Sequence, residues 1–311
     1  MSKLSIALEE YLKMRRALGY KLRAQDCQLR KFVEFADGIG AHFITTDLAL
    51  KWAMQPVQTQ PIWHVRRLSM VRQFARHCSA TDPRTIVPPP DLLSYRYRRP
   101  APYIYRSDHI TQLLRAAKRL RSDTGLRSHT YATLLGLYVV TGMRCNEALQ
   151  LDRNDVDLVN GVLTIRGTKF GKSRYLPLHL TTKRVLQRYT VSRDCIFPKP
   201  LSPSFLLSER GTRLNQSTVE NTFVRLSRQI GLRRPGDARG PRIHDLRHHF
   251  AISTLVRWYR RGVDVEQHLP ELSTYLGHTN ITNTYWYLTS TPELLRYALH
   301  RVERSSRGSQ S

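Results

Sequence analysis

Over the first ninety residues, hydrophobic positions recur every three or four residues, which is the period of a helix with one buried face. Gly19 and Gly38 predict where the first two of these segments end, and Thr45 or Thr46 is the expected N-cap of the third. The pattern predicts four successive helices, over residues 4–20, 27–38, 45–54 and 62–78.

Prolines break this pattern between residues 83 and 102. A proline lacks a backbone N–H and clashes with the preceding turn, so a regular helix is precluded there. A chain of 311 residues is also longer than most single hydrophobic cores. We therefore expect a helical domain over 1–98, a proline-rich basic linker over 99–106 and a second domain over 107–311.

The second domain mixes two hydrophobic periods. Residues 107–120 have helical spacing with Ser107 or Asp108 as the cap, and another helix is expected to end near Thr141–Gly142. Over 161–178, β-branched and apolar residues flank a glycine-containing turn, which predicts a β-hairpin. The predicted fold class is therefore mainly α with a small antiparallel β-sheet.

The charge of the chain narrows its class of partner. It carries 50 Lys and Arg against 24 Asp and Glu, a net charge of +26. Solubility alone does not require so one-sided a balance, so we expect a polyanionic partner, most simply nucleic acid. The fourth predicted helix adds four arginines that lie either on a solvated face or on a face that contacts phosphates: Arg66, Arg67, Arg72 and Arg76.

Neither the apolar segments nor the cysteines predict a membrane or an oxidising compartment. The longest apolar stretch, residues 131–140, is too short to span a bilayer and predicts a buried helix. The four cysteines lie far apart without a CxxC pair, which is typical of reduced thiols in a cytosolic protein. We expect a cytoplasmic, DNA-associated protein with no membrane partner.

One segment of the second domain, "TGMRCNEALQL", places an arginine where it can bind an anion. Arg144 follows a turn at Gly142 and lies at the start of a helix, where backbone N–H groups add to its guanidinium. Glu147 lies one turn further on and can orient that arginine. A surface Arg–Glu pair is the alternative interpretation.

A second segment, "RIHDLRHHFA", places His244 and Arg247 on one face of a helix. His248 lies four residues after His244, a spacing that also permits a zinc site. The segment has no HExxH motif, cysteine pair or acidic cluster. A phosphate, which guanidinium binds through two hydrogen bonds, therefore fits better.

Two further segments carry reactive side chains. In "TKFGKSRYLPL", lysines on a tight turn are either simply exposed or project into a groove as proton donors. In "STYLGHTNITNTYWYL", Tyr287 lies nine residues after His278. If Tyr287 is the reactive phenol, Tyr285 and Trp286 are expected to be packing residues.

Taken in this order, the segments "TGMRCNEAL", "GTKFGKSRYLPL", "HDLRHHFA" and "LGHTNITNTYWY" resemble the tyrosine recombinase, or phage integrase, family. The resemblance covers the second domain, and the first is similar to the helical, SAM-like core-binding domain of two-domain members. It implies a mixed α+β catalytic domain. It also implies a site-specific recombinase or integrase of a mobile element, which cuts and rejoins DNA through a 3′-phosphotyrosyl intermediate.

Carried over to this sequence, the resemblance implies a clamp on the scissile phosphate. Arg144 and Arg247 would bind the non-bridging oxygens and offset the charge that builds up in the pentacoordinate transition state. His278 would donate a further hydrogen bond to the phosphate. Glu147 occupies the supporting acidic position of the first motif.

The resemblance also implies how protons and the nucleophile act. Aligning "SRYLPL" with the family's return strand favours Lys169 over Lys172 as the general acid that protonates the departing 5′ oxygen, and leaves Lys172 as a DNA contact. His244 would serve in proton transfer with the nucleophile. Tyr287 would attack phosphorus, because the nine-residue offset from the histidine selects it over Tyr285.

The implied partner is double-stranded DNA with specific recombination sites, bound by a homotetramer on two duplexes, with accessory proteins as further candidates. No cofactor and no metal ion are expected. The amphipathic segment 292–304 either docks on a neighbouring protomer or packs on its own. The interval between Arg247 and His278 is longer than the family's common form, which predicts a longer helix or a small loop around Arg260–Gly262.

Two other functions fit parts of the pattern. A type IB topoisomerase uses similar groups to relax supercoils. A catalytically silent DNA-binding regulator could keep the fold without the reaction.

Overall fold

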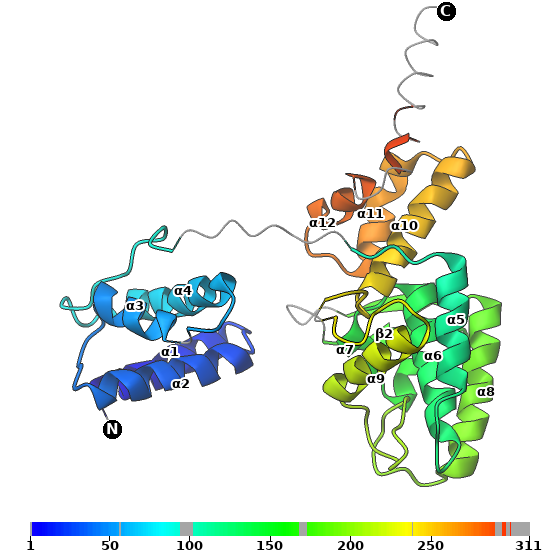
Figure 1. Cartoon of the computed structure of the whole chain (residues 1–311), viewed down its shortest axis with the longest axis horizontal. Helices are drawn as coiled ribbons and strands as arrows, with labels where there is room; N and C mark the ends of the chain where they lie inside the picture. The colour runs from blue at the N-terminus through cyan, green and yellow to red at the C-terminus, as the bar shows by residue number, and fades with distance from the viewer. Residues whose placement is uncertain are drawn as a thin grey trace, which may run out of the picture. The chain divides into compact units, whose positions relative to one another are not determined.

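The computed structural model describes residues 2–55, 57–93, 102–167, 173–237, 239–289, 294–296 and 299. The chain divides into two compact units, Met1–Pro100 and Ala101–Ser311. Figure 1 shows the helices of each unit, which are described separately below.

The described residues of the first unit form four helices, as the hydrophobic pattern predicts: α1 Lys3–Ala17, α2 Arg23–Gly38, α3 Thr46–Met54 and α4 Pro61–Cys78. Each contributes a large buried side chain to one core, namely Leu12, Phe32, Trp52 and Phe74. The hydroxyl of Thr45 accepts a hydrogen bond from the backbone N–H of Leu48, which confirms Thr45 as the N-cap of α3.

The second unit is mainly helical with a small sheet, which confirms the predicted fold class. The strands are β1 Val156–Asp157, β2 Val162–Ile165 and β3 Arg174–Pro177. They pair antiparallel in the order β1–β2–β3, with Ile165 opposite Arg174. The helices are α5 Ser107–Lys118, α6 Leu126–Thr141, α7 Cys145–Leu149, α8 Leu180–Ile196, α9 Gln216–Gln229, α10 Asp245–Arg260, α11 Val265–Leu276 and α12 Thr282–Tyr285.

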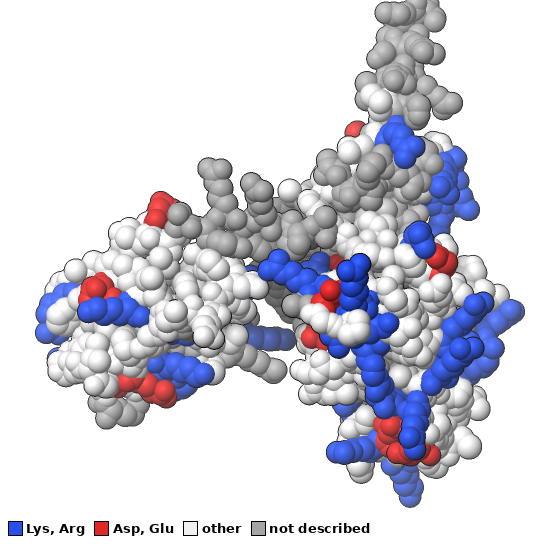
Figure 2. Space-filling view, viewed as in Figure 1, with Lys and Arg blue, Asp and Glu red and all other residues white. Residues whose placement is uncertain are grey.

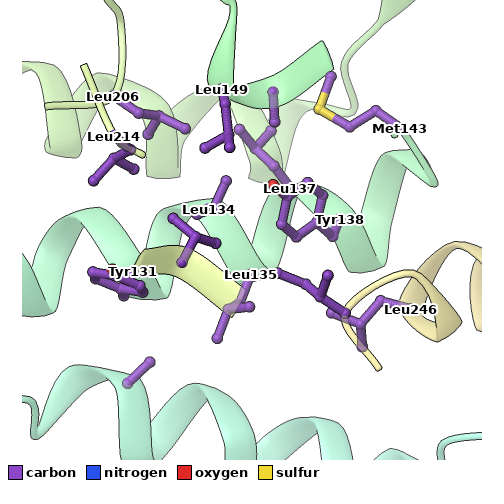
Figure 3. Close-up of a cluster of buried hydrophobic side chains, with 14 of the residues drawn as sticks. Tyr131, Leu134, Leu135, Leu137, Tyr138, Met143, Leu149, Leu206, Leu214 and Leu246 are labelled. Atoms are coloured by element: carbon purple, nitrogen blue, oxygen red, sulfur yellow. The ribbon is translucent and has the colours of Figure 1, made fainter. Parts of the chain in front are cut away.

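Helix α6 forms the centre of this unit and packs against α5, α8 and α10. Figure 3 shows Leu134, Leu135 and Leu137 of α6 together with Met143 and Leu246, all of which are buried. Met143 immediately precedes Arg144, and Leu246 immediately precedes Arg247. Burial of these two neighbours therefore fixes where both arginines leave the core.

A second cluster of buried residues lies between α10 and α11 and includes Leu255, Leu269, Leu276 and Tyr287. The two helices are joined by a tight turn at Arg261 and Gly262, and they lie side by side in Figure 1. The long interval between Arg247 and His278 is thus two helices joined by a short loop.

Two expectations about the start of the second unit need correction. The N-cap of α5 is Arg106, not Ser107 or Asp108, because the helix begins one residue earlier than the cap prediction required. Residues 102–106 also belong to the second unit rather than to a free linker, since Tyr105 is 2% exposed and its hydroxyl donates to the carbonyl of Arg242 at 3.2 Å.

The remaining expectations fall largely outside the described residues. These include the first part of the predicted linker, 99–101, and most of the predicted helix over 292–304, of which 294–296 are helical. Among the helices that the structure describes, none is long and apolar enough to cross a bilayer.

Candidate active site

Arg144 lies at the turn between α6 and α7. Helix α6 ends at Gly142, which has a φ of 59°, and a Cβ there would lie 2.5 Å from a ring carbon of Phe250. The turn makes Arg144 the N-cap of α7, and Glu147 reaches back to it. One carboxylate oxygen accepts from the Arg144 backbone N–H at 2.9 Å, and the other accepts from its guanidinium at 2.8 Å.

Arg247 lies in the first turn of α10 and is 3% exposed. Its guanidinium donates to the carbonyls of Gly142 and Leu276, both at 2.8 Å. Burial, and after it the positive charge of Arg144, lower the pKa of Arg247 to about 10. Arg247 therefore remains a cation at neutral pH, and its contacts hold it against two other segments of the unit.

A third arginine, Arg174 at the start of β3, completes this group. Its two terminal nitrogens donate to both carboxylate oxygens of Glu147 at 3.0 and 2.7 Å, and its Nε donates to the carbonyl of Tyr275 at 2.9 Å. We call Arg144, Arg174 and Arg247 the arginine cluster. Sequence reasoning did not single out Arg174, although it stands in the "SRYLPL" strand used to align the lysine.

The arginine cluster converges on the C-terminal end of α11. The carbonyls of residues 275, 276 and 277 accept from Arg174, Arg247 and Arg144 respectively, the last at 2.7 Å. These are terminal carbonyls that lack partners within the helix and carry its partial negative charge. A Cβ on Gly277 would lie 2.7 Å from a guanidinium nitrogen of Arg174, so the cluster also requires glycine there.

Glu147 is the carboxylate of this cluster, and its side chain is 8% exposed. Burial acts to raise its pKa, but hydrogen bonds and charge from Arg174, followed by those from Arg144, outweigh burial and bring the pKa to about 2. Glu147 is therefore ionised at neutral pH. Three guanidinium charges against one carboxylate leave the cluster with two positive charges.

Tyr287 lies beside this cluster and is 2% exposed. Its hydroxyl lies 3.2 Å from Nδ1 of His248, and its ring is stacked with that of His278 at 6.1 Å between centroids. Trp286 packs edge-on against both Tyr287 and His248, as expected of a packing residue. Tyr285, however, is 45% exposed, so the expectation that it packs is wrong. The short helical turns over 282–289 direct its ring outward instead.

After the role that the sequence predicts for Tyr287, we call Tyr287, Trp286, His248 and His278 the nucleophile cluster. His248, which the sequence suggested only as a zinc ligand, provides the hydrogen-bonding nitrogen beside the phenol. His244 lies next to it, with ring centroids 4.9 Å apart. Among the described residues, no group of three or more His, Cys, Asp or Glu could hold a metal ion.

His278 and His244, which lie near the arginine cluster, are neutral at pH 7. Burial lowers the pKa of His278 to about 3, and the charges of Arg247 and Arg144 contribute. Although part of the His244 surface is exposed, desolvation by the surrounding protein and then the charge of Arg247 lower its pKa to about 4. Nδ1 of His278 lies 2.7 Å from the hydroxyl of Thr284, which leaves its other ring nitrogen for another partner.

The remaining candidate residues fall into three groups. Lys169 and Lys172 lie outside the described residues. Arg67 and Arg72 bind within the first unit instead of facing solvent: Arg67 donates to the carbonyl of Trp52 at 2.7 Å, and Arg72 donates to three proline carbonyls over 88–90. Arg66 and Arg76 are exposed. Figure 2 shows many more Lys and Arg than Asp and Glu on the visible surface of the second unit.

Comparison with known proteins identifies the family. The model of the phage integrase family matches residues 104–293. The y4rB protein of Sinorhizobium fredii, named as an integrase/recombinase, is 47% identical over 98% of both chains. The tyrosine recombinase XerD of Caulobacter vibrioides is 31% identical over 73% of this chain and 70% of its own.

A solved structure shares the fold. The site-specific recombinase XerH, in a post-cleavage complex with its palindromic difH substrate, has a TM-score of 0.66 and 20% identity, covering 95% of this chain and 84% of that one. Residues 104–293, which the family model matches, include every residue of the arginine cluster and the nucleophile cluster. The chain therefore belongs to the phage integrase family of tyrosine-type, site-specific recombinases.

Proposed function

We propose that the two clusters together cut and rejoin double-stranded DNA at specific recombination sites through a covalent 3′-phosphotyrosyl intermediate. The observation that carries this proposal is the convergence of a buried phenol, two neutral imidazoles and a cluster with two net positive charges. This combination supplies a nucleophile and a site for a phosphate, using side chains alone.

In the proposed reaction, Arg144 and Arg247 bind the non-bridging oxygens of the scissile phosphate. Each guanidinium has five N–H donors, and its internal contacts use one hydrogen bond from each of its two terminal nitrogens. Both can therefore keep these contacts and still donate to a phosphate. His278 adds a hydrogen bond through its remaining ring nitrogen.

The covalent step exchanges one phosphodiester for another. The Tyr287 oxygen attacks phosphorus, the neutral imidazole of His244 takes up its proton, the bond from phosphorus to the 5′ oxygen breaks, and Lys169 protonates that oxygen. Because Nδ1 of His248 lies beside the phenol and His244 is the next ring, we assign the orientation of the phenol to His248 and uptake of the proton to His244. The 5′-hydroxyl of a second strand reverses the step and joins new ends.

Tyr287 is buried, so its hydroxyl must move before it can reach DNA bound at the surface. Its 2% exposure means that a phosphate has no access to the phenol unless the segment over 282–289 moves. The proposed function therefore includes a rearrangement of this short helical segment when DNA binds. Assembly as a homotetramer on two paired sites is the arrangement we propose for strand exchange.

The test is covalent capture on DNA. The purified chain is incubated with a pool of duplexes, each nicked close to a randomised core, so that cleavage releases a short fragment and traps the adduct. We expect an adduct stable to SDS, whose DNA yields the recognition sequence. Tyr287→Phe should form none, whereas Tyr285→Phe, the matched exposed phenol, should form as much as wild type.

The same assay separates the alternatives. An equally strong adduct from Tyr287→Phe would move the nucleophile elsewhere. DNA binding without any adduct would support a silent regulator. A topoisomerase would relax plasmids that lack the selected sequence, whereas a recombinase should give rearranged products only when two copies are present.

A further inference from the structure

Arg174 makes more internal contacts than either arginine of the proposed phosphate clamp. It donates to both oxygens of Glu147 and to the carbonyl of Tyr275, and its side chain is 12% exposed. All three nitrogens of its guanidinium donate to these groups, whereas the internal contacts of the Arg144 and Arg247 guanidinium groups use their terminal nitrogens and leave Nε out. The role of Arg174 must therefore be exerted through the residues it holds.

The residue that it holds most directly is Glu147. Each oxygen of that carboxylate accepts one hydrogen bond from Arg144 and one from Arg174. A buried carboxylate with a single cationic partner would draw the charge of that partner away from any other anion. Because Arg174 is the second partner, one guanidinium can offset Glu147 while the other keeps its charge for the phosphate.

We propose that Arg174 is a positioning residue for the cleavage reaction: its guanidinium offsets the charge of Glu147 and leaves that of Arg144 to the scissile phosphate. This inference rests on the proposed function. It assigns to the arginine of β3 a role distinct from phosphate binding, lysine acid catalysis and nucleophilic attack.

The charges of the cluster indicate which step depends on Arg174. With Arg174 present, the cluster carries two net positive charges, and without it the cluster carries one. A bound phosphodiester has one negative charge, and the pentacoordinate species formed by phenolate attack has two. Loss of Arg174 should therefore weaken binding of the transition state more than binding of DNA, which lowers the cleavage rate rather than the affinity.

Arg174 also ties the site to the end of α11. Its Nε holds the carbonyl of Tyr275, while the next two carbonyls hold Arg247 and Arg144. Its guanidinium lies against Gly277, the residue before His278. Arg144, Arg247 and His278 are thus all attached to the C-terminal end of α11, whose position Arg174 fixes.

The experiment measures two quantities on the duplex selected by covalent capture: the single-turnover rate of adduct formation and the dissociation constant. Arg174→Gln should slow adduct formation by about 10- to 100-fold, in the range found for residues that orient reactive groups, while the dissociation constant changes less than about twofold. Arg166→Gln is the matched control, since Arg166 follows the paired strand β2 and bonds Asp155 rather than Glu147. It should change neither quantity.

The double variant Arg174→Gln/Glu147→Gln distinguishes charge offset from a merely structural role. Removing the carboxylate restores two positive charges, so the double variant should recover at least part of the lost rate. A double variant as slow as Arg174→Gln, or slower, would overturn the proposal, as would a wild-type rate in Arg174→Gln. If Arg174→Gln does not fold, Arg174→Met, which also removes the charge, carries the same comparison with and without Glu147→Gln.

A readout without DNA keeps the inference separate from the proposed function. Wild type should lose stability as the pH falls from about 4.5 toward 2, where Glu147 takes up a proton. In Arg174→Gln the pKa of Glu147 rises, so the difference in melting temperature between the two proteins should shrink over that range. A constant difference would overturn the charge offset even if wild type formed no adduct.

Discussion

The arginine cluster and the nucleophile cluster meet in one site, but they are held in different ways. Each guanidinium of the arginine cluster is fixed by two or more hydrogen bonds, several of them to backbone carbonyls. The hydroxyl of Tyr287 lies 3.2 Å from an imidazole nitrogen of His248, and its ring packs against those of His278 and Trp286. The three guanidinium groups are thus fixed before DNA arrives, whereas Tyr287, which we propose as the nucleophile, is buried and must move to reach a phosphate.

The arginine cluster should tolerate substitution least. Arg247→Lys keeps the charge but cannot reproduce the planar fork that spans Gly142 and Leu276. We expect adduct formation to fall by about 10²- to 10³-fold, as for loss of a preorganised transition-state donor. The unfolding free energy should fall by about 1–3 kcal/mol because a buried carbonyl loses its partner.

Rates of covalent capture and urea unfolding measure these two effects. The comparison breaks if Arg247→Lys cleaves at the wild-type rate, because charge alone would then suffice and the fixed geometry would be irrelevant. Arg257→Lys, in the last turn of the same helix, serves as the control and should be neutral in both assays.

The nucleophile cluster should depend on one atom of His248. His248→Asn places an amide near the position of Nδ1, whereas His248→Leu removes the hydrogen-bonding group. We expect His248→Leu to slow adduct formation by about 10²-fold, the lower range for a group that assists proton transfer. His248→Asn should retain most of the activity if the group only orients the phenol.

Single-turnover rates between pH 6 and 9 would measure this. Equal losses in the two variants would instead assign His248 to proton transfer. No loss in either variant would mean that the phenol leaves His248 before it reacts, and the orienting role would be wrong.

The sequence predicts the helices and two of the three arginines of the site, Arg144 and Arg247, for a common reason. Burial sets the helical period, and the same buried neighbours, such as Met143 before Arg144, determine where a polar side chain leaves the core. Gly142 and Gly277 mark turns in the sequence because a positive φ and close packing leave few other residues possible there. Local pattern thus predicts the positions of these residues well.

Other features depend on contacts between distant segments, which a local pattern does not contain. Arg174 reads as an ordinary strand residue until Glu147, 27 positions away, folds against it. The fourth predicted helix looks uniformly basic, yet Arg67 and Arg72 bind carbonyls that chain folding brings to them. Tyr285 and Tyr287 differ in exposure because a short helical segment turns between them.

The pH dependence of stability links the two clusters. His278 belongs to the nucleophile cluster, but the charges of the arginine cluster contribute to its lowered pKa. The pKa of His278 is about 3 when folded, against an ordinary value of 6.5. The unfolded chain therefore takes up the proton first, and the stabilising contribution, present above pH 6.5, is lost as the pH falls toward 3.

Between pH 6.5 and 5, wild type should lose about 1–2 kcal/mol more unfolding free energy than His278→Asn, which has no group to protonate. Urea unfolding at both pH values measures the difference. An equal loss in the two proteins would show that burial and the arginine charges together do not lower the pKa of His278.

The smallest effects should come from arginines outside both clusters. Arg66 and Arg76 are exposed on α4, whereas Arg72 on the same helix is fixed to proline carbonyls. If the exposed pair contacts phosphates, each Gln substitution should lower the slope of log K against log salt by about 0.9 without changing the cleavage rate at saturation. Arg72→Gln should instead lower the melting temperature and leave the slope unchanged. An unchanged slope in Arg66→Gln and Arg76→Gln would restrict the DNA contacts of this helix to other positions and assign its excess charge to solvation.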